Sequence, residues 1–286
     1  MTALPFVKMH GAANDFVVVD QRRPALPADP AALQTLVARL CDRRRGIGAD
    51  GVLVLEPDAE FDFRMRYFNR DGGAAEFCGN GARCLARFAL DLGLGRSGVV
   101  RFASDAGPQQ ARAEADGRIE LLLGSGAPIA GSRAVAVTAA GRAFAGRAID
   151  TGVPHLVVEV ERVEWVPLME WGAALRHHAE FEPRGTNVDF VTRLDPRRLA
   201  MRTYERGVEG ETLACGTGAV ASALVAMEAE APGEYERTVL TAGGDELAVR
   251  ARRVAGGFDR VRLAGPAEVA FTGTWPEPVA ALSSHG

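Results

Sequence analysis

Two cysteines occupy the same short motif in the two halves of the 286-residue chain. Cys78 begins Cys-Gly-Asn-Gly-Ala, Cys215 begins Cys-Gly-Thr-Gly-Ala, and each motif follows a segment that starts with Met-Arg. A lone cysteine of this kind is more often packed in the core, since free cysteine is among the most buried residue types. Core packing gives no reason to repeat a cysteine with its glycines in both halves, so we interpret the pair as functional thiols.

The motif predicts a thiol at the start of a helix in each half. A cysteine there feels the positive end of the helix dipole and accepts hydrogen bonds from free backbone N–H groups, and both effects lower the pKa of a thiol. The adjoining Gly79 and Gly216 let a ligand approach the backbone closely, so the same turn can bind a carboxylate. Two thiols and one bound carboxylate suit removal of the α-proton of an amino acid on one face and return of a proton on the other.

The repeat also places different residues at equivalent positions. Asn69 corresponds to Glu205, and in a looser alignment Asn14 corresponds to His155. The alignment thus matches neutral amides in the first half with titratable residues in the second. Taken alone, His155 would more often be a structural or surface histidine, but its place after Gly-x-Pro and opposite Asn14 favours a functional role. We predict that His155 and Glu205 set the protonation states of the two thiols.

Composition narrows the class of protein. An apolar fraction of 47% with 24% charged residues is ordinary for a globular protein, and a net charge of −4 gives no reason to expect nucleic acid or an anionic membrane as partner. The sequence lacks a signal-peptide pattern and any apolar run of membrane-span length, so we expect a cytosolic protein. Four cysteines form neither a disulfide framework nor a Cys-x-x-Cys motif, so no metal is expected.

One further count bears on cofactors. Lys8 is the only lysine in the chain, and its place near the N-terminus makes it a poor candidate for the Schiff base of pyridoxal phosphate. We therefore expect cofactor-free chemistry.

Similar elements recur in both halves. Apolar patterning predicts helices at 31–43, 79–92, 169–178 and 216–230 and strands at 16–19, 52–55, 61–68, 99–103, 111–115, 119–123, 135–137, 147–150, 156–160, 188–192, 200–204, 237–241, 247–253 and 260–263. The helix at 216–230 is apolar nearly all round, which favours burial inside a wrapped sheet. The alignment of the halves extends to residues 46–52 and 185–191, so two domains are expected.

The domain boundary is predicted at the segment Gly-Ser-Gly-Ala-Pro, residues 124–128, which is the best linker in the sequence. Residues 269–272 are a candidate strand that returns to the first lobe. We predict an N-terminal lobe of residues 1–126 and 265–286 and a C-terminal lobe of residues 127–264.

A set of motifs spread over nearly the whole chain is highly specific: Lys8-Met9-His10-Gly11, Asn14-Asp15-Phe16, Gly46-Ile47-Gly48-Ala49-Asp50-Gly51, Phe68-Asn69-Arg70-Asp71-Gly72, Cys78-Gly79-Asn80-Gly81-Ala82-Arg83-Cys84, Pro154-His155, Gly185-Thr186-Asn187-Val188-Asp189, Tyr204-Glu205-Arg206-Gly207 and Ala214-Cys215-Gly216-Thr217-Gly218. Through them the sequence resembles the diaminopimelate epimerase family. The resemblance implies conversion of LL-2,6-diaminopimelate to the meso form without cofactor or metal. It also implies an α+β fold of two pseudo-symmetric lobes, each a mostly antiparallel or mixed sheet around a central helix, with the active site in the cleft between them.

The same resemblance assigns roles to individual residues. It implies that Cys78 and Cys215 are the acid/base thiols, tuned by His155 and Glu205. The substrate-binding residues that it implies are Gly79, Asn80, Gly216 and Thr217 for the reacting carboxylate and Asn14, Asn69, Asn187 and Arg206 for the rest of the substrate. An arginine suits the distal carboxylate, since its planar fork can bind it bidentately. We also expect a homodimer.

Two positions depart from the family pattern. Many members have Asn where this chain has Val153, and many have Gln where it has Gly51. Each change removes a polar group that would read the distal end of the substrate, while proton transfer is left untouched.

Three alternatives stay open. A two-thiol racemase of a ring amino acid such as proline is the nearest, although Asn80, Asn187 and Arg206 favour a substrate with a second charged end. A cysteine hydrolase would use one thiol with His155, but it leaves the second Cys-Gly-x-Gly turn unexplained. A binding protein without activity would be expected to have lost a thiol or the tuning pair, and both are present.

Overall fold

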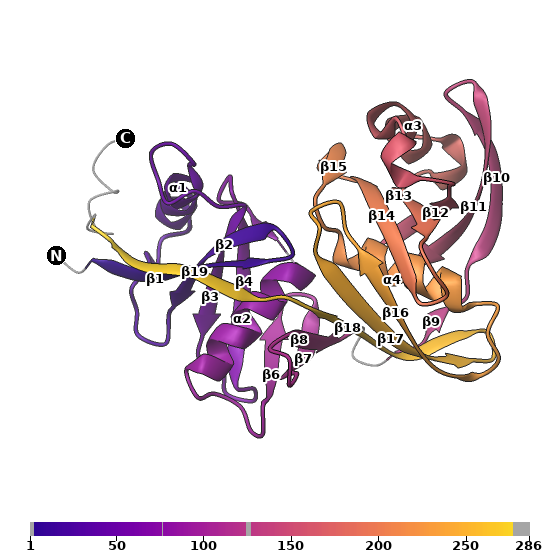
Figure 1. Cartoon of the computed structure of the whole chain (residues 1–286). Helices are drawn as coiled ribbons and strands as arrows, with labels where there is room; N and C mark the ends of the chain where they lie inside the picture. Colours follow the sequence, from indigo (N-terminus) through magenta and orange to yellow (C-terminus); the bar gives the residue numbers. More distant parts are fainter. Residues whose placement is uncertain (1–2, 76, 124–126, 277–286) are drawn as a thin grey trace. The chain divides into compact units, whose positions relative to one another are not determined.

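The structure is a computed structural model that describes residues 3–75, 77–123 and 127–276 (Figure 1). The chain divides into two compact units: the residues up to Leu121 with those from Pro266 onward form the first unit, and Leu122–Gly265 form the second. Residues 124–126 of the expected linker lie outside the described residues. Of the helices in the described part of the chain, none combines the length and the apolarity needed to cross a bilayer.

The first unit is a mixed sheet with a helix on each face. Its strands pair in the order β19 (Glu268–Trp275), β1 (Leu4–Gly11), β2 (Asn14–Asp20), β3 (Gly51–Glu56), β4 (Phe63–Asn69), β6 (Val99–Ser104) and β7 (Gly107–Ala113), with β5 (Ala74–Ala75) on β4. The pairs β2–β3 and β4–β6 are parallel and the others are antiparallel. α2 (Gly79–Asp91) contacts the sheet from β1 to β7, α1 (Pro30–Cys41) packs on its other face, and β8 (Ile119–Leu122) follows β7 in sequence.

The second unit repeats this arrangement. Its strands pair in the order β10 (Arg133–Ala139), β11 (Arg142–Asp150), β12 (Pro154–Glu159), β13 (Asn187–Arg193), β14 (Arg198–Glu205), β16 (Gly233–Leu240), β17 (Glu246–Val254) and β18 (Gly257–Gly265), with β15 (Gly210–Thr212) on β14 and β9 (Ile129–Ala130) on β18. The parallel pairs are β12–β13 and β14–β16. α4 (Gly216–Met227) is enclosed by the sheet. α3 (Leu168–Arg176) and the 3-10 helix Val163–Trp165 contact β13 and β14, and the 3-10 helix Ala179–Phe181 lies between α3 and β13 in sequence.

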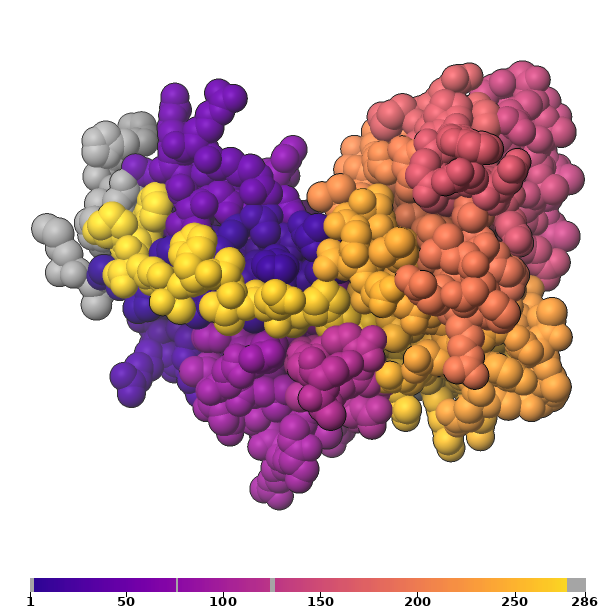
Figure 2. All heavy atoms as spheres, viewed as in Figure 1, coloured from indigo at the N-terminus to yellow at the C-terminus, as the bar shows by residue number. Residues whose placement is uncertain are grey.

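The two units therefore share one strand order, and they differ in where the edge strand comes from. In the second unit β10 directly precedes β11, with which it pairs, whereas in the first unit β19 returns from the end of the chain to pair with β1. Figure 2 shows this strand in yellow across the surface of the first unit. The prediction that residues 269–272 return to the first lobe is confirmed, as is the α+β fold of two pseudo-symmetric lobes around central helices.

Local sequence explains the helix boundaries. Asp29 caps α1 by accepting a hydrogen bond from the backbone N–H of Ala32 at 2.8 Å, and Pro30 opens the helix. The helix was expected to run to residue 43, but it ends at Cys41. The Asp42 carboxylate instead accepts hydrogen bonds from the next backbone N–H groups and forms a turn.

Helix α4 confirms the expectation of all-round burial. Eight of its residues are buried, and they lie on all sides of the helix: Gly218, Ala219, Val220, Ala221, Ser222, Ala223, Leu224 and Met227. It contacts strands from β11 to β18. A helix without a polar face is stable in water only when it is enclosed in this way.

Strand β1 had not been predicted. Leu4 and Phe6 are buried on it, but Pro5 and Lys8 break the apolar alternation that identifies a strand in sequence. Lys8 is nonetheless buried, because its amine forms an ion pair with Asp15 at 2.5 Å. A buried ion pair thus takes the place of an apolar residue in the pattern.

Candidate active site

The two thiols occupy the same capping position on the two central helices. Cys215 is the N-cap of α4, and its Sγ accepts a hydrogen bond from the backbone N–H of Gly218 at 3.4 Å. Cys78 is the N-cap of α2, and its Sγ accepts one from the N–H of Gly81 at 3.5 Å. The predicted place of both cysteines at a helix start is confirmed. They differ in exposure, since Cys215 is buried and Cys78 is half-buried.

The predicted lowering of the thiol pKa is wrong for Cys215. Burial raises the pKa of this thiol well above its ordinary value, and the nearby carboxylates of Glu205 and Asp189 raise it further. Hydrogen bonds from Thr217 and Gly218 act in the opposite direction but do not offset the loss of water. Burial and the two carboxylates thus favour the protonated thiol of Cys215.

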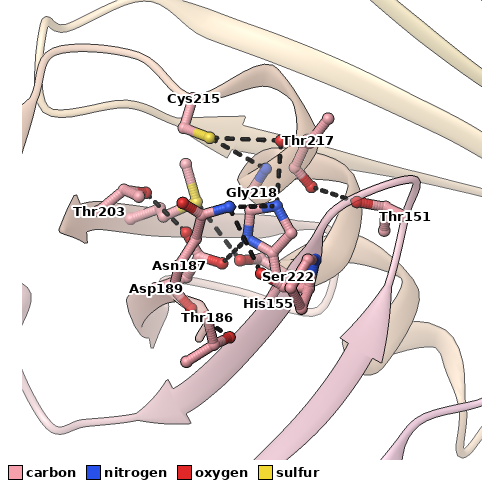
Figure 3. Close-up of polar contacts among 12 residues, drawn as sticks. Thr151, His155, Thr186, Asn187, Asp189, Thr203, Cys215, Thr217, Gly218 and Ser222 are labelled. Atoms are coloured by element: carbon pink, nitrogen blue, oxygen red, sulfur yellow. Dashed lines mark hydrogen bonds and ion pairs between the residues drawn. The ribbon is translucent and has the colours of Figure 1, made fainter. Parts of the chain in front are cut away.

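His155 lies at the centre of a buried polar network in the second unit (Figure 3). Its Nδ1 is 2.7 Å from Oδ2 of Asp189, and its Nε2 is 3.0 Å from Oγ1 of Thr217. The Thr217 hydroxyl in turn lies 3.5 Å from Sγ of Cys215. Asp189 is fully buried and accepts a second hydrogen bond from the Thr203 hydroxyl at 2.7 Å.

Asn187 and Arg206 are joined at the end of this network. Oδ1 of Asn187 accepts a hydrogen bond from the backbone N–H of Arg206 at 2.7 Å, and its Nδ2 faces Nε2 of His155 at 3.4 Å. The Arg206 guanidinium donates to the carbonyl of Arg184 at 3.0 Å. Glu205 is the last residue of β14, and burial raises the pKa of its carboxyl.

A different network supports the first unit's candidate residues. The Asn14 amide donates to Asp50 at 2.7 Å, and its Oδ1 accepts a hydrogen bond from Asn80 at 3.2 Å. Asn80 is buried and also accepts from the Arg83 guanidinium at 2.8 Å. Asn69 is exposed at the end of β4, where Glu205 stands at the end of β14.

Strand registers correct the looser part of the sequence alignment. The paired motifs make Tyr67 equivalent to Thr203; Leu53 pairs with Tyr67, and Asp189 pairs with Thr203. Asp189 therefore corresponds to Leu53, and the registers of the parallel pairs then make His155 equivalent to Phe16. The expected matches of Asn14 with His155 and of residue 50 with residue 189 are wrong, because loops before these strands differ in length.

The structure thus gathers one set of candidate residues within each unit. Cys215, Thr217, His155 and Asn187 share the second unit's network, and Cys78 caps the helix that carries Asn80 in the first. Sequence reasoning gave no role to Asp189 or Thr203, although Asp189 lies inside one of the aligned motifs. Cys41 and Cys84 are buried on α1 and α2, where burial raises the pKa of each to about 12.

Candidate metal ligands do not gather at this site. In the part of the chain that the structure describes, no three His, Cys, Asp or Glu side chains are grouped so that they could hold a metal ion.

Comparison with known proteins gives consistent matches. The sequence model of the family described as diaminopimelate epimerase matches residues 6–127 and 147–254. A diaminopimelate epimerase of Aquifex aeolicus is 41% identical over 86% of this chain and 89% of the relative, and one of Methanocella arvoryzae is 39% identical over 96% and 97%.

Solved structures share the fold at lower identity. A phenazine biosynthesis protein of the PhzF family from Bacillus anthracis is 12% identical, with a TM-score of 0.72 over 96% of this chain and 99% of the other. A hydroxyproline epimerase of Agrobacterium vitis is 18% identical, with a TM-score of 0.66 over 97% and 94%. The extent and identity of the sequence matches show that the chain is an isomerase that belongs to the diaminopimelate epimerase family.

Proposed function

We propose that this enzyme converts LL-2,6-diaminopimelate to meso-diaminopimelate by moving protons at one Cα between two cysteine thiols. The observation that carries the proposal is the identical capping position of Cys78 and Cys215 on equivalent helices. Relatives that cover nearly the whole chain bear the name of this activity. The proposal assigns the reacting carboxylate to the starts of α2 and α4 and the α-proton to their N-cap thiols.

The helix starts supply what the reaction needs. Removing the α-proton puts negative charge on the substrate carboxylate, and free backbone N–H groups at Gly79, Asn80, Gly216 and Thr217 are preorganised donors for it. A Cβ at Gly79 would meet nothing within 4 Å, so this turn leaves room for a ligand to reach the backbone. One thiolate then takes the α-proton and the other thiol gives a proton to the opposite face, so the two sulfurs exchange protonation states in each turnover.

The proposal assigns the distal end of the substrate to Asn14, Asn69, Asn187 and Arg206. Asn187 and Arg206 are held together by a hydrogen bond, so they present an amide and a guanidinium as one unit. We propose that this pair replaces some of the polar contact missing at Val153 and Gly51. His155 and Glu205 tune the thiols in this scheme, since the Glu205 charge raises the pKa of Cys215 and the charge of His155 lowers the pKa of Glu205.

The environment of the only lysine supports a mechanism without pyridoxal phosphate. The Lys8 amine is bound to Asp15 and to the carbonyl of Gly48, and its side chain is 9% exposed. A Schiff base would have to break this buried ion pair, at a cost of about 3–5 kcal/mol. We propose that the enzyme acts without cofactor or metal.

Solvent exchange tests the proposal directly. In deuterium oxide, the enzyme is expected to incorporate deuterium at Cα of LL-diaminopimelate while it forms the meso isomer. Mass spectrometry measures the deuterium, and chiral chromatography measures the isomer. Cys78→Ala and Cys215→Ala are expected to abolish epimerisation, whereas Cys41→Ala, a change at a buried cysteine elsewhere, keeps it. Normal turnover by either of the first two variants would refute the two-thiol mechanism, and faster racemisation of proline than of diaminopimelate would refute the substrate.

We further propose that two copies associate through the outer edge of β19. β19 pairs along its length with β1, and Val269 and Phe271 on it are each 48% exposed. An apolar edge strand is a ready surface for pairing with another copy. Phe271→Glu is expected to shift the mass measured by light scattering from dimer to monomer; a monomeric wild-type enzyme would refute the proposal.

We also propose that the enzyme works in the cytosol, because free thiols persist in that reducing compartment.

A further inference from the structure

We propose that Asp189 is a positioning residue that, through His155 and the Thr217 hydroxyl, prepares Cys215 to act as a base. The inference deepens the proposed function and rests on it for the role of Cys215. It concerns a residue to which neither the sequence motifs nor the capping geometry had given a role.

The contacts fix the protonated nitrogen of His155. Oδ2 of Asp189 lies 2.7 Å from Nδ1 and can only accept when the carboxylate is ionised, so Nδ1 carries the proton. On the other side of the ring, the Arg206 N–H donates to Oδ1 of Asn187 and thereby turns the donor Nδ2 towards Nε2. Nε2 is therefore an acceptor, and the Thr217 hydroxyl at 3.0 Å donates to it.

Asp189 is itself held in one orientation. Its Oδ1 accepts the Thr203 hydroxyl at 2.7 Å, and both His155 and Asp189 have fully buried side chains. Because both side chains are buried, the carboxylate cannot turn to solvent, and the imidazole cannot change its tautomer without losing a hydrogen bond. The geometry resembles that of any carboxylate that orients a histidine base and then stabilises it as the cation.

The chain of contacts gives a balanced route for one proton. The S–H proton of Cys215 moves to Oγ1 of Thr217 while the hydroxyl proton of Thr217 moves to Nε2 of His155. One S–H and one O–H bond break, and one O–H and one N–H bond form. The product is a thiolate that accepts a hydrogen bond from Thr217, with an imidazolium paired to Asp189, so the net charge of the group is unchanged. The thiolate is then ready to take the α-proton.

At the equivalent positions of the first unit, all of which the structure describes, the residues of this route are replaced. The ladder positions equivalent to His155 and Asp189 hold Phe16 and Leu53, and Asn80 stands where the second unit has Thr217. Cys78 therefore serves as an internal control in the same protein for any change to the second unit's network.

The test measures alkylation of both thiols in one sample. The wild type and Asp189→Asn are treated with iodoacetamide, and modification of Cys215 and Cys78 is followed by mass spectrometry of the digest. The relay predicts that Asp189→Asn slows modification of Cys215 about tenfold, because less thiolate forms, and leaves Cys78 unchanged. If Asp189 acted on Cys215 only through its charge, the substitution would have the opposite effect, because a nearby negative charge disfavours the thiolate.

Turnover gives the second readout. Asp189→Asn and Thr217→Val are expected to lower kcat by about 10²–10⁴-fold with little change in KM, since the relay acts in the chemical step. Thr217→Ser keeps the hydroxyl and is expected to keep most of the activity, so the Thr217 pair decides the question even if Asp189→Asn fails to fold. Long-range ¹H–¹⁵N NMR spectra are expected to show neutral His155 with its proton on Nδ1.

The outcomes separate this inference from the proposed function. Faster or unchanged alkylation of Cys215 in Asp189→Asn, equal turnover by Thr217→Val and Thr217→Ser, or a proton on Nε2 in the wild type would overturn the relay. An enzyme that acts on another amino acid, or on none, would overturn the proposed function, while the alkylation and NMR measurements would still decide the relay.

Discussion

The starts of helices α2 and α4 have the same backbone geometry but rest on different surroundings. A Cβ added to Gly81 on α2 would meet the side chains of Leu53 and Phe16, whereas one added to Gly218 on α4 would meet Asp189 and Sγ of Cys215. Both helices begin with a cysteine that accepts a hydrogen bond from its third following residue. The same scaffold thus carries a thiol in each unit. The two strand residues that pack beneath the helix differ: they are apolar in the first unit, where we call them the apolar support, and polar in the second, where we call them the polar support.

The polar support is stable only because its members satisfy one another. A buried carboxylate or imidazole without partners costs several kcal/mol. Here the Asp189 carboxylate has two hydrogen-bond partners and the His155 ring has three. The apolar pair in the first unit needs no partner and contributes by packing alone. The second unit thus has the more demanding core, because its buried polar groups must all find partners.

The largest effect is expected when a carboxylate is introduced at Leu53, the first unit's equivalent of Asp189. Leu53 is fully buried and has no ionisable partner at the equivalent of His155, where Phe16 stands. Leu53→Asp is expected to lower the free energy of unfolding by about 3–5 kcal/mol, measured by urea denaturation. Leu53→Met is the control, with a cost of under about 1.5 kcal/mol because it conserves volume. A cost for Leu53→Asp no larger than that of the control would show that the first unit tolerates the polar support.

The same glycine substitution in the two units gives a matched pair. A Cβ at Gly218 would lie 2.4 Å from Oδ1 of Asp189, which is fixed by two hydrogen bonds, so Gly218→Ala is expected to cost about 1–3 kcal/mol. At Gly81 the nearest atom, at 2.8 Å, is the flexible end of Leu53, so Gly81→Ala is expected to cost less. Urea denaturation and kcat check both. Equal losses of stability and activity would contradict the assignment of a rigid polar network to one unit alone.

Much of this arrangement could be predicted because the chemistry repeats in sequence. The cysteine motif occurs twice before a helical pattern, and this alone predicted that both cysteines stand at helix starts. The return of β19 could be predicted as well, since 269–272 is apolar and follows the last strand of the second unit. Local patterns and internal repetition carried these predictions.

What sequence did not reveal depends on register and burial. Asp189 had been aligned with Asp50, and only strand pairing shows that it matches Leu53 and faces His155. The direction of the Cys215 pKa also could not be read from the motif, because desolvation depends on everything packed around the sulfur. Likewise, Lys8 masked strand β1, since its ion partner is found only once the sheet has formed.

The smallest expected effect is on the pH dependence of stability. The contributions of one carboxyl group in each unit are expected to change in opposite directions as the pH rises. Burial raises the pKa of Asp15 in the first unit, but hydrogen bonds from Arg43 and Lys8 outweigh it and hold that pKa well below 3.8. Its contribution to stability is present above pH 3.8 and is lost as the pH falls towards the lowered value. Burial raises the pKa of Glu205 in the second unit above 4.5, so its contribution is present below pH 4.5 and is lost as the pH rises through the raised value.

Two variants isolate these contributions. The stability advantage of the wild type over Asp15→Asn is expected to shrink as the pH falls below 3.8, and its advantage over Glu205→Gln to shrink as the pH rises from 4.5 towards neutrality. A tenfold difference in proton affinity between the folded and unfolded states corresponds to about 1.4 kcal/mol, which urea denaturation at a series of pH values resolves. If both differences changed in the same direction, Glu205 would have to be stabilised as an anion in the folded protein. It would then add to the negative charge that disfavours the Cys215 thiolate at neutral pH, and the thiol would depend still more on the base provided by His155.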